Sequence, residues 1–321
     1  MPDVVLVVLP GAYASSVAAT LDVLAAAAAL APGLSLAPPR VRVVAPQADD
    51  VALTSGLRIA ADPLPDRLPA GRPLWIVPGL GTATASATQR LLESEPACRV
   101  GALLARASRR GDEIAASCAA VLLLGKHRLL DGRRATCTWW LADLLRAVAP
   151  SCAIETLRMV VEDGPLVTAG AAMAHVDLML ALLRRRYGRP LAERVGQVLL
   201  IESRPLQGRF VQADLLALGD ELVAELEAIV RDALPRPPSV GAVAQRLAMS
   251  TRTLSRRVKA ATGRSPSQLV QAVRLTAART LLQTSRLTVD EVAERVGYQD
   301  AASLRRLMRR TMSATPTQLR I

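Results

Sequence analysis

The residues best suited to chemistry in this sequence surround a cysteine that follows a short predicted strand. The run Glu113–Ala116 is mostly apolar, and Cys118 and Ala119 come shortly after it, at the start of an apolar stretch that predicts a helix. A strand that turns sharply into a helix exposes a nucleophile at the turn and points the first amides of the helix at it. The spacing therefore predicts a cysteine elbow with Cys118 as the candidate nucleophile.

A catalytic thiol also needs a base, and the sequence offers few. Cysteine hydrolases use a histidine to take the proton of the thiol. The chain has two histidines, His127 shortly after the elbow and His175 one turn into a later predicted helix. Either could approach the thiol in the folded chain, but we expect a structural role for each. The four cysteines show no paired short spacing, so we expect free thiols, no metal site and no cofactor.

The elements that must position the elbow alternate between strand and helix. The continuous apolar run Val4–Leu9 is typical of a parallel strand that is buried on both faces. Alternation at this spacing predicts an α/β doubly wound domain. Strands are expected at 4–9, 41–45, 74–77 and 113–116, a hairpin at 160–168, and helices at 17–30, 89–108 and 170–187.

Charge is distributed unevenly along the chain. Residues 1–234 hold 24 Lys and Arg against 24 Asp and Glu, whereas residues 236–321 hold 16 against 4. A neutral body with a basic end indicates a module that binds a polyanion, and a merely solvated basic face is the alternative. The first residues lack a basic segment before their apolar run, and no apolar stretch is suited to span a membrane. We therefore expect a cytoplasmic protein without membrane contact.

A helix-turn-helix pattern occurs twice in the basic region, which we expect to be all helical. In the first unit Ser250 can cap the second helix. In the second unit, about 48 residues later, Thr288 opens a capping box, Gly297 suits the turn, and Asp300 can cap the last helix. A long helix over 266–282 joins the units. The second helix of each unit could then enter successive major grooves of DNA, roughly 34 Å apart.

The last hundred residues resemble the DNA-binding domain of the AraC/XylS family. The matching stretches are SVGAVAQRLAMSTRTLSRRVKAATGRSPSQL, VRLTAARTLL and LTVDEVAERVGYQDAASLRRLMRRTMSATPTQLR. The chain departs from that family at Val258, Leu304 and Met308, where phenylalanines are usual, and at Ser313, where glycine is usual. These departures affect packing and one helix end, and they leave the exposed face of each second helix unchanged.

By position, the resemblance assigns the contacts with double-stranded DNA to the second helix of each unit. Arginine suits this task because its planar fork can bond both acceptors of a guanine, whereas alanine can only contact a thymine methyl. A phosphate contact is the alternative for each arginine. The expected DNA-binding residues are Arg252, Ser255, Arg256 and Lys259 in the first unit and Ala301, Ala302, Arg305, Arg306 and Arg309 in the second.

The first 190 residues resemble the class I glutamine-amidotransferase-like (PfpI-like) fold, a flavodoxin-like doubly wound sheet. With the basic end, the chain is similar to the GlxA-type transcriptional regulators, through VVLVVLPG, LWIVPG, AASCAAVLLLGKHRLLDGRRATCTWW and VEDGPLVTAGAAMAHVDLMLALL. The partner histidine of the family falls here at Thr138, its acid at Ser16 and its elbow glycine at Ala120. Because threonine cannot take a proton from the thiol at neutral pH, the resemblance implies a degraded site and no enzyme activity.

We therefore expect the elbow to bind a small-molecule effector without converting it. The alternatives are an inert buried thiol in a domain that only dimerises, and a redox-sensing Cys118. The expected ligand-binding residues are Gly79, Leu80, Cys118, Ala119, Thr138 and Gly170.

The predicted organisation is an effector and dimerisation domain over 1–205, a linker over 206–215 and a DNA-binding domain over 216–321. The predicted function is a homodimeric, sequence-specific transcriptional regulator, as an activator that could contact RNA polymerase. One alternative is a cysteine-dependent amidase or hydrolase that carries a DNA-binding tether. Another is a constitutive DNA-binding protein whose α/β domain is vestigial.

Overall fold

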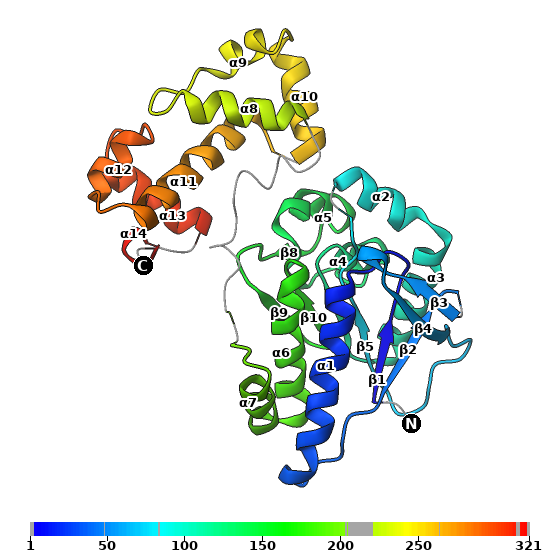
Figure 1. Cartoon of the computed structure of the whole chain (residues 1–321). Helices are drawn as coiled ribbons and strands as arrows, with labels where there is room; N and C mark the ends of the chain where they lie inside the picture. Colours follow the sequence, from blue (N-terminus) through cyan, green and yellow to red (C-terminus); the bar gives the residue numbers. More distant parts are fainter. Residues whose placement is uncertain are drawn as a thin grey trace. The chain divides into compact units, whose positions relative to one another are not determined.

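The computed structural model describes residues 3–47, 49–82, 84–202, 204, 221–262, 264–312 and 315–319 (Figure 1). The chain divides into two compact units, formed essentially by residues 1–207 and 208–321. The predicted linker over 206–215 and the substituted position Ser313 lie outside the described residues.

An eight-stranded sheet of order β3-β4-β2-β1-β5-β6-β10-β9 forms the centre of the first unit. The strands pair in parallel except for β3 with β4 and β9 with β10. Every residue of β1, β5, β6 and β10 is buried, as expected for parallel strands covered on both faces. This confirms the doubly wound α/β prediction. The strands are β1 (Val4–Val7), β2 (Val41–Ala45), β3 (Asp49–Ala52), β4 (Arg58–Pro63), β5 (Leu74–Val77), β6 (Ile114–Ser117), β9 (Val160–Asp163) and β10 (Leu166–Ala169), with a separate pair β7 (Arg134–Ala135) and β8 (Ala153–Ile154).

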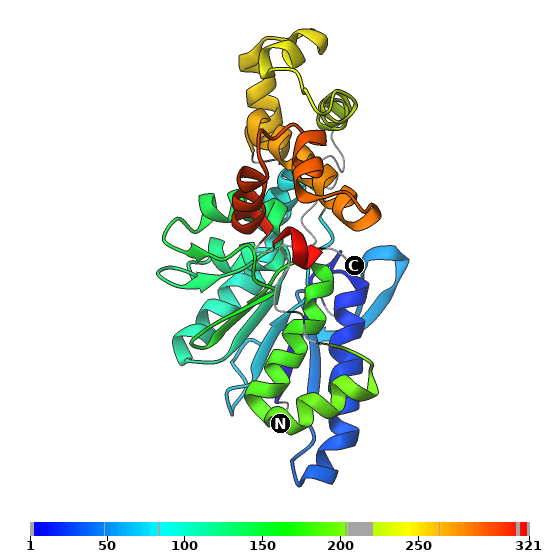
Figure 2. The same ribbon diagram turned by 90° about the vertical axis from the view of Figure 1, so that its left-hand side faces the viewer.

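Helices cover both faces of this sheet (Figures 1 and 2). The helices α1, α6 and α7 pack against one another on one face, and α3 and α4 lie on the other. A short 3-10 turn, η4 (Ala172–Ala174), leads directly into α6. The helices are α1 (Ala14–Leu30), α2 (Ala85–Glu93), α3 (Glu95–Arg110), α4 (Ala120–Lys126), α5 (Ala142–Val148), α6 (His175–Tyr187) and α7 (Arg189–Val198).

The segment Ala14–Leu34, which contains α1, is long and apolar enough to cross a membrane by length and composition, with a mean hydropathy of 1.8. We expected no such segment, but its many alanines raise the mean hydropathy. In the structure α1 packs on α6 and α7 and buries Val17, Thr20 and Val23 among others. The core helix of a soluble domain passes the same test, so this finding does not by itself indicate a membrane protein.

The predicted single helix over 89–108 was wrong, because two helices, α2 and α3, occupy this region. The break lies at Ser94, whose side chain accepts a hydrogen bond from the Ala97 amide and caps α3. Pro96 follows in the first turn of α3. Proline lacks an N–H and clashes with the preceding helical turn, so a helix can begin there but cannot continue through it.

The described residues of the second unit form helices and no strand, as predicted. Its long helix α11 begins at a capping box in which Ser265 and Gln268 bond each other's backbone amides. One buried apolar cluster joins α11 to the last helices through Leu282, Val292 and Leu304 among others. The helices are α8 (Glu221–Asp232), α9 (Val240–Arg246), α10 (Thr251–Thr262), α11 (Pro266–Thr284), α12 (Val289–Arg295), α13 (Ala301–Met312) and α14 (Pro316–Leu319).

Candidate nucleic-acid interface and cysteine elbow

The first candidate recognition helix is α10, preceded by α9. The Ser250 hydroxyl accepts a hydrogen bond from the Thr253 amide at 3.1 Å, so Ser250 caps α10 as predicted. Leu254 and Val258 are completely buried, which directs the opposite face of α10 to solvent. On that face Arg252, Arg256 and Lys259 are exposed and Ser255 is half-buried.

The second candidate recognition helix is α13, preceded by α12. Thr288 and Glu291 form the predicted capping box at the start of α12, and Gly297 takes a φ of 82° in the turn. The Asp300 carboxylate accepts a hydrogen bond from the Ser303 amide at 2.6 Å and caps α13. The exposed face of α13 holds Ala302, Arg305, Arg306 and Arg309.

The expectation that Ala301 presents its side chain to DNA was wrong. Ala301 is 3% exposed and packs in the cluster that contains Leu304 and Met308. These three positions share the i, i+3, i+7 face of a helix, which is the face that α13 buries. Ala302 lies one residue further on and points outward, so it is the alanine available to a thymine methyl.

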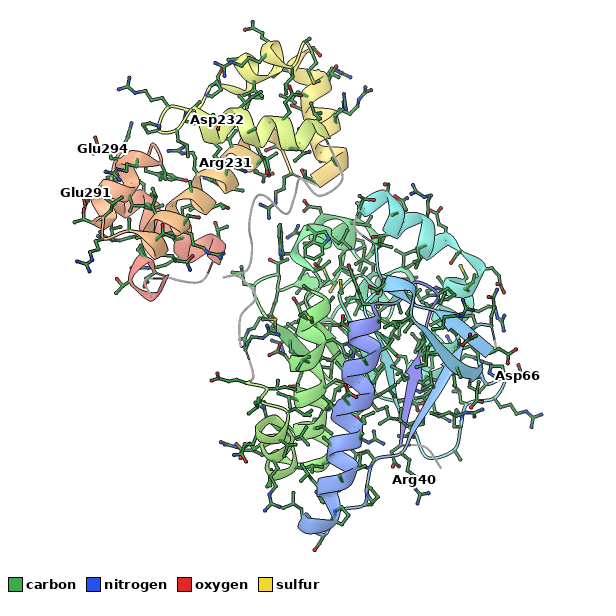
Figure 3. The ribbon with its side chains drawn as sticks, viewed as in Figure 1. Arg40, Asp66, Arg231, Asp232, Glu291 and Glu294 are labelled. Carbon is green, nitrogen blue, oxygen red and sulfur yellow. The ribbon has the colours of Figure 1, made fainter. Side chains whose placement is uncertain are left out.

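Charge on the outward faces is of one sign. Neither α10 nor α13 contains an acidic residue. Close to α13 in sequence, acids lie on α12, where Figure 3 labels Glu291 and Glu294, and at Asp300, which caps α13. Since the outward arginines have no acid on their own helix, they present net positive charge, which suits contact with phosphates and with guanine edges.

Sequence reasoning missed Arg274 of α11, which holds the turn between α12 and α13 in place. Its Nε donates a hydrogen bond to the Val296 carbonyl at 2.8 Å, and Nη2 donates to the Gly297 carbonyl. The guanidinium also stacks on Tyr298, 4.0 Å from the ring centroid. The available signal was an arginine on the connecting helix combined with an aromatic residue directly after the turn glycine.

The elbow has the predicted backbone shape. Cys118 lies between β6 and α4. Its φ is 55°, a left-handed backbone conformation that is unusual for a residue other than glycine. The residue is 1% exposed. Burial raises the pKa of the Cys118 thiol to about 11, against the weaker opposing effect of the Ala119 amide, the Thr138 hydroxyl and the Ala172 amide. The thiol is therefore protonated at neutral pH and a poor nucleophile.

His175 does not act on the thiol, because both of its ring nitrogens are engaged elsewhere. The Thr20 hydroxyl donates to the Ser16 carbonyl at 2.9 Å, so it accepts the Nε2 proton of His175 at 2.7 Å. The Nδ1 atom is then left to accept from the Ser117 hydroxyl at 2.8 Å. Burial lowers the pKa of His175 to about 4, so the ring is neutral. These bonds give His175 a structural role.

His127 lies against α3 and not at the elbow. A methyl group placed on Gly101 of α3 would lie 2.0 Å from the His127 ring, so the ring fills the space that this glycine leaves. Its Nε2 atom is buried without a hydrogen-bond partner. Burial, with Lys126 acting in the same direction, lowers the pKa of His127.

The structure brings several of the expected ligand-binding residues together and buries all of them. A methyl group on Gly79 would lie 3.1 Å from the Cys118 Cβ. The Ala119 amide and the Thr138 hydroxyl both lower the pKa of the thiol. Leu80 forms an isolated β-bridge with Ala12, which follows β1. The Gly170 amide donates a hydrogen bond to the Met159 carbonyl at 2.9 Å. Every member of the set lies in the buried interior of the α/β unit.

Two further residues line the elbow that sequence reasoning missed. Tyr13 lies beside Gly79, with its Cδ2 3.3 Å from a methyl group placed on that glycine. Burial raises the pKa of Tyr13, and the nearby Cys118 acts in the same direction. Ala172 turns its amide to the thiol from η4. Two features of the sequence could have identified these residues. Tyr13 is an aromatic residue two positions after Pro10-Gly11, and Ala172 is a small residue shortly after the end of β10.

Comparisons with known proteins agree with both halves of this description. Residues 3–185 match the DJ-1/PfpI family and residues 243–321 match a helix-turn-helix domain. The chain is 26% identical over 282 residues to the HTH-type transcriptional regulator CdhR of Pseudomonas aeruginosa, covering 87% of this chain and 81% of that protein. It is 28% identical over 281 residues to the HTH-type transcriptional regulator GlxA of Rhizobium meliloti, covering 78% and 86%.

A solved structure supports the fold of the first unit. A THiJ/PfpI family protein from Pseudomonas syringae superposes with a TM-score of 0.52 at 22% identity, over 64% of this chain and 77% of that one. The family match covers more than half of the sequence and contains the whole elbow. The chain thus belongs to the DJ-1/PfpI family, and it joins that domain to an AraC-type helix-turn-helix domain, the architecture of the HTH-type transcriptional regulators that it resembles.

Proposed function

We propose that this regulator binds specific DNA sites through α10 and α13 and that a small effector at the elbow controls their occupancy. The observation that carries the DNA proposal is the pair of exposed, acid-free helix faces, each capped and backed by buried apolar residues. The connector α11 contacts α10 of the first helix-turn-helix and α12 of the second, which supports a fixed spacing between α10 and α13. One chain can then recognise two half-motifs in successive grooves as a direct repeat.

Selection on genomic DNA tests the DNA proposal. Full-length protein is incubated with fragmented DNA of its own genome at about 0.15 M salt with excess random competitor, and the retained DNA is sequenced. Enrichment of a few sites with two short motifs about one helical turn apart is the expected result. Uniform, salt-sensitive retention would contradict it. Arg286→Ala, which removes an exposed arginine outside α10 and α13, is the control that should retain the selected sites.

The elbow supports binding without turnover. Thr138 stands where a base is needed, both nitrogens of His175 are bonded elsewhere, and the Cys118 thiol has a raised pKa. The effector is expected to displace the packing around Cys118 and to shift the population of two protein states with different DNA affinity. The groups that act on the pKa of the thiol are uncharged, which favours an effector whose part at the elbow is uncharged.

Ligand screening on the full chain tests the effector proposal. A panel of amino acids, amides, amines and short carboxylic acids is scored by the rise in the unfolding temperature of the α/β unit and by the change in affinity for a selected DNA site. A hit should lose both effects in Thr138→Phe, which places a bulky ring beside the thiol. Leu57→Phe, at an exposed position of the same unit, should retain them. A hit that raises the unfolding temperature equally in Thr138→Phe would exclude the elbow as its site.

The retained left-handed backbone of Cys118 favours a second candidate, a cysteine amidase with a DNA-binding tether. Ammonia release from glutamine and other primary amides separates the two. The regulator proposal expects no release above that of Cys118→Ser. Release by the native protein that Cys118→Ser abolishes would establish the amidase.

The remaining features of the proposal follow from the regulator function. We propose a cytoplasmic homodimer with an effector and dimerisation domain over 1–205, a linker over 206–215 and a DNA-binding domain over 216–321. Activation through contact with RNA polymerase is proposed as its output. In-vitro transcription from a selected site checks that output, since a repressor would lower the amount of transcript.

A further inference from the structure

One corner of the α/β unit contacts both the elbow and the last described residue before α8. This corner consists of η4 and the first turn of α6, residues 172–177. On the elbow side, the Ala172 amide faces the Cys118 thiol, and His175 accepts the hydrogen bond of Ser117, the neighbour of Cys118. The Ser16 hydroxyl donates to the Ala172 carbonyl at 3.3 Å and ties the corner to α1.

The opposite side of the corner holds Arg204. The Asp177 carboxylate is 2% exposed, and it accepts the Arg204 backbone N–H at 2.7 Å, Nη2 at 2.6 Å and Nε at 3.2 Å. Arg204 Nη2 also donates to the Met173 carbonyl at 2.8 Å. A buried carboxylate with three donors from one residue depends on that residue, because an unpaired buried charge is strongly unfavourable.

We propose that the contact of Asp177 and Met173 with Arg204, the Arg204 latch, transmits the state of the elbow to the chain that leads to the DNA-binding unit. Arg204 precedes residues 205–220, which connect the first unit to α8. Displacing the thiol displaces Ala172 and Ser117. Within the corner, η4 carries that movement to Met173 and the first turn of α6 carries it to Asp177. Because the latch combines a directed fork with a backbone bond, a small shift of the corner breaks it rather than stretches it.

The latch deepens the proposed effector control of DNA occupancy and rests on it. A second ion pair nearby offers a matched comparison. Arg189 and Glu193 pair on α7 with both side chains more than half exposed, and this pair lies outside η4, the first turn of α6 and the elbow. Loss of that pair should therefore leave the coupling intact.

A double-mutant cycle on full-length protein tests the latch without a known effector. The perturbation at the elbow is Gly79→Ala, whose new methyl group would lie 3.1 Å from the Cys118 Cβ and 3.3 Å from Tyr13. The latch is removed by Asp177→Asn with Arg204→Gln, which leaves no unpaired buried charge. Affinity for a selected genomic site is measured for the native protein, each variant and their combination, and thermal unfolding confirms that each is folded.

Gly79→Ala is expected to change the DNA affinity at least about fivefold in the native background and less than about twofold in the latch variant. The Arg189→Ala background should keep the full change. An equal change with and without the latch, or no change in the native background, would overturn the proposal. Failure of the native protein to select any genomic site would instead refute the DNA-binding proposal.

Hydrogen exchange of the Arg204 amide gives a second measurement that requires no DNA. That amide is bonded to Asp177 Oδ1, so opening of the latch exposes it to exchange. Its exchange should accelerate in Gly79→Ala and in Arg204→Lys, which keeps the charge but lacks the fork. Unchanged exchange in Gly79→Ala would overturn the latch even if the double variant failed to fold.

Discussion

The functional groups of the two units are arranged in opposite ways. In the helical unit the arginines of α10 and α13 point outward, while apolar side chains of the same helices form the core. In the α/β unit the polar groups around the elbow point inward, and Ser117, His175 and Thr20 form a chain of buried hydrogen bonds. The outward arginines are accessible to DNA as they stand, whereas the elbow residues that we propose to bind an effector are buried.

The chain departs from the patterns of the families that it resembles in two ways, and the two departures differ in their consequences. Replacing the phenylalanines by Val258, Leu304 and Met308 keeps completely buried positions in the helical unit, so the reading faces are maintained. The resemblance implies that Thr138 replaces a partner histidine and so removes the base that the thiol would need, while the backbone shape at Cys118 is retained. Packing tolerates exchange among apolar side chains, but proton transfer does not tolerate loss of its base.

The largest effect expected is that of Gly297→Ala on the helical unit. A methyl group there would lie 2.0 Å from the Pro235 carbonyl oxygen, and the φ of 82° is unfavourable for alanine. The two penalties together should lower the free energy of unfolding of this unit by about 2–4 kcal/mol. Denaturant unfolding of the full chain, followed by circular dichroism, measures the loss.

Gly132→Ala provides the matched control in the other unit. Gly132 has a φ of 68°, but nothing lies within 4 Å of a methyl group at this position. The expected loss is about 1 kcal/mol, from the backbone alone. Equal losses for the two variants would show that the contact between Gly297 and Pro235 is unimportant.

The buried histidine predicts a pH dependence that belongs to the α/β unit. The pKa of His175 is about 4 in the folded chain and near 6.5 when unfolded, so the unfolded state binds a proton first as the pH falls. Stability is complete above pH 6.5 and decreases toward pH 4, by about 3 kcal/mol in all and about 2 kcal/mol by pH 5. Unfolding measured at pH 7 and pH 5 gives the difference.

Substitution at His175 removes this pH dependence. His175→Gln can still accept the Ser117 hydroxyl but does not titrate, so its stability should differ little between pH 7 and pH 5, although it is lower at pH 7. His127→Gln should keep most of the native dependence, since His127 is less deeply buried than His175. A native-like slope in His175→Gln would refute the assignment.

A smaller effect is expected on DNA binding from Arg256→Ala. Arg256 is exposed on α10, and we propose that it contacts a base edge. Its removal should cost about 1–3 kcal/mol at a selected site and relax the preference at one base pair. Titration of selected and random DNA checks this, with Arg286→Ala as the control. Equal loss on both DNAs would reassign Arg256 to a phosphate contact.

The elements of both units could largely be predicted because they depend on local patterns. Caps at Ser250, Thr288 and Asp300 and the apolar run of β1 are visible in the sequence and are present in the structure. The state of the elbow could not be predicted in this way. The pairing of His175 with Ser117 and Thr20 joins residues 58 and 155 positions apart, and only the assembled fold shows which nitrogen meets which hydroxyl.

The smallest effect expected tests the one DNA-binding assignment that the structure overturned. Ala302 is exposed at the start of α13 and Ala301 is buried, although they are neighbours in sequence. Ala302→Asn should change the free energy of unfolding by less than about 0.5 kcal/mol and alter the base preference of the second half-motif.

Ala301→Asn should instead destabilise the helical unit by about 1–3 kcal/mol, because it buries an amide without partners. Sequencing of selected DNA and denaturant unfolding of both variants measure the two effects. If Ala301→Asn changed the base preference at native stability, the inward face of α13 would be wrongly assigned, and with it the contrast between an outward-reading helical unit and an inward-facing elbow.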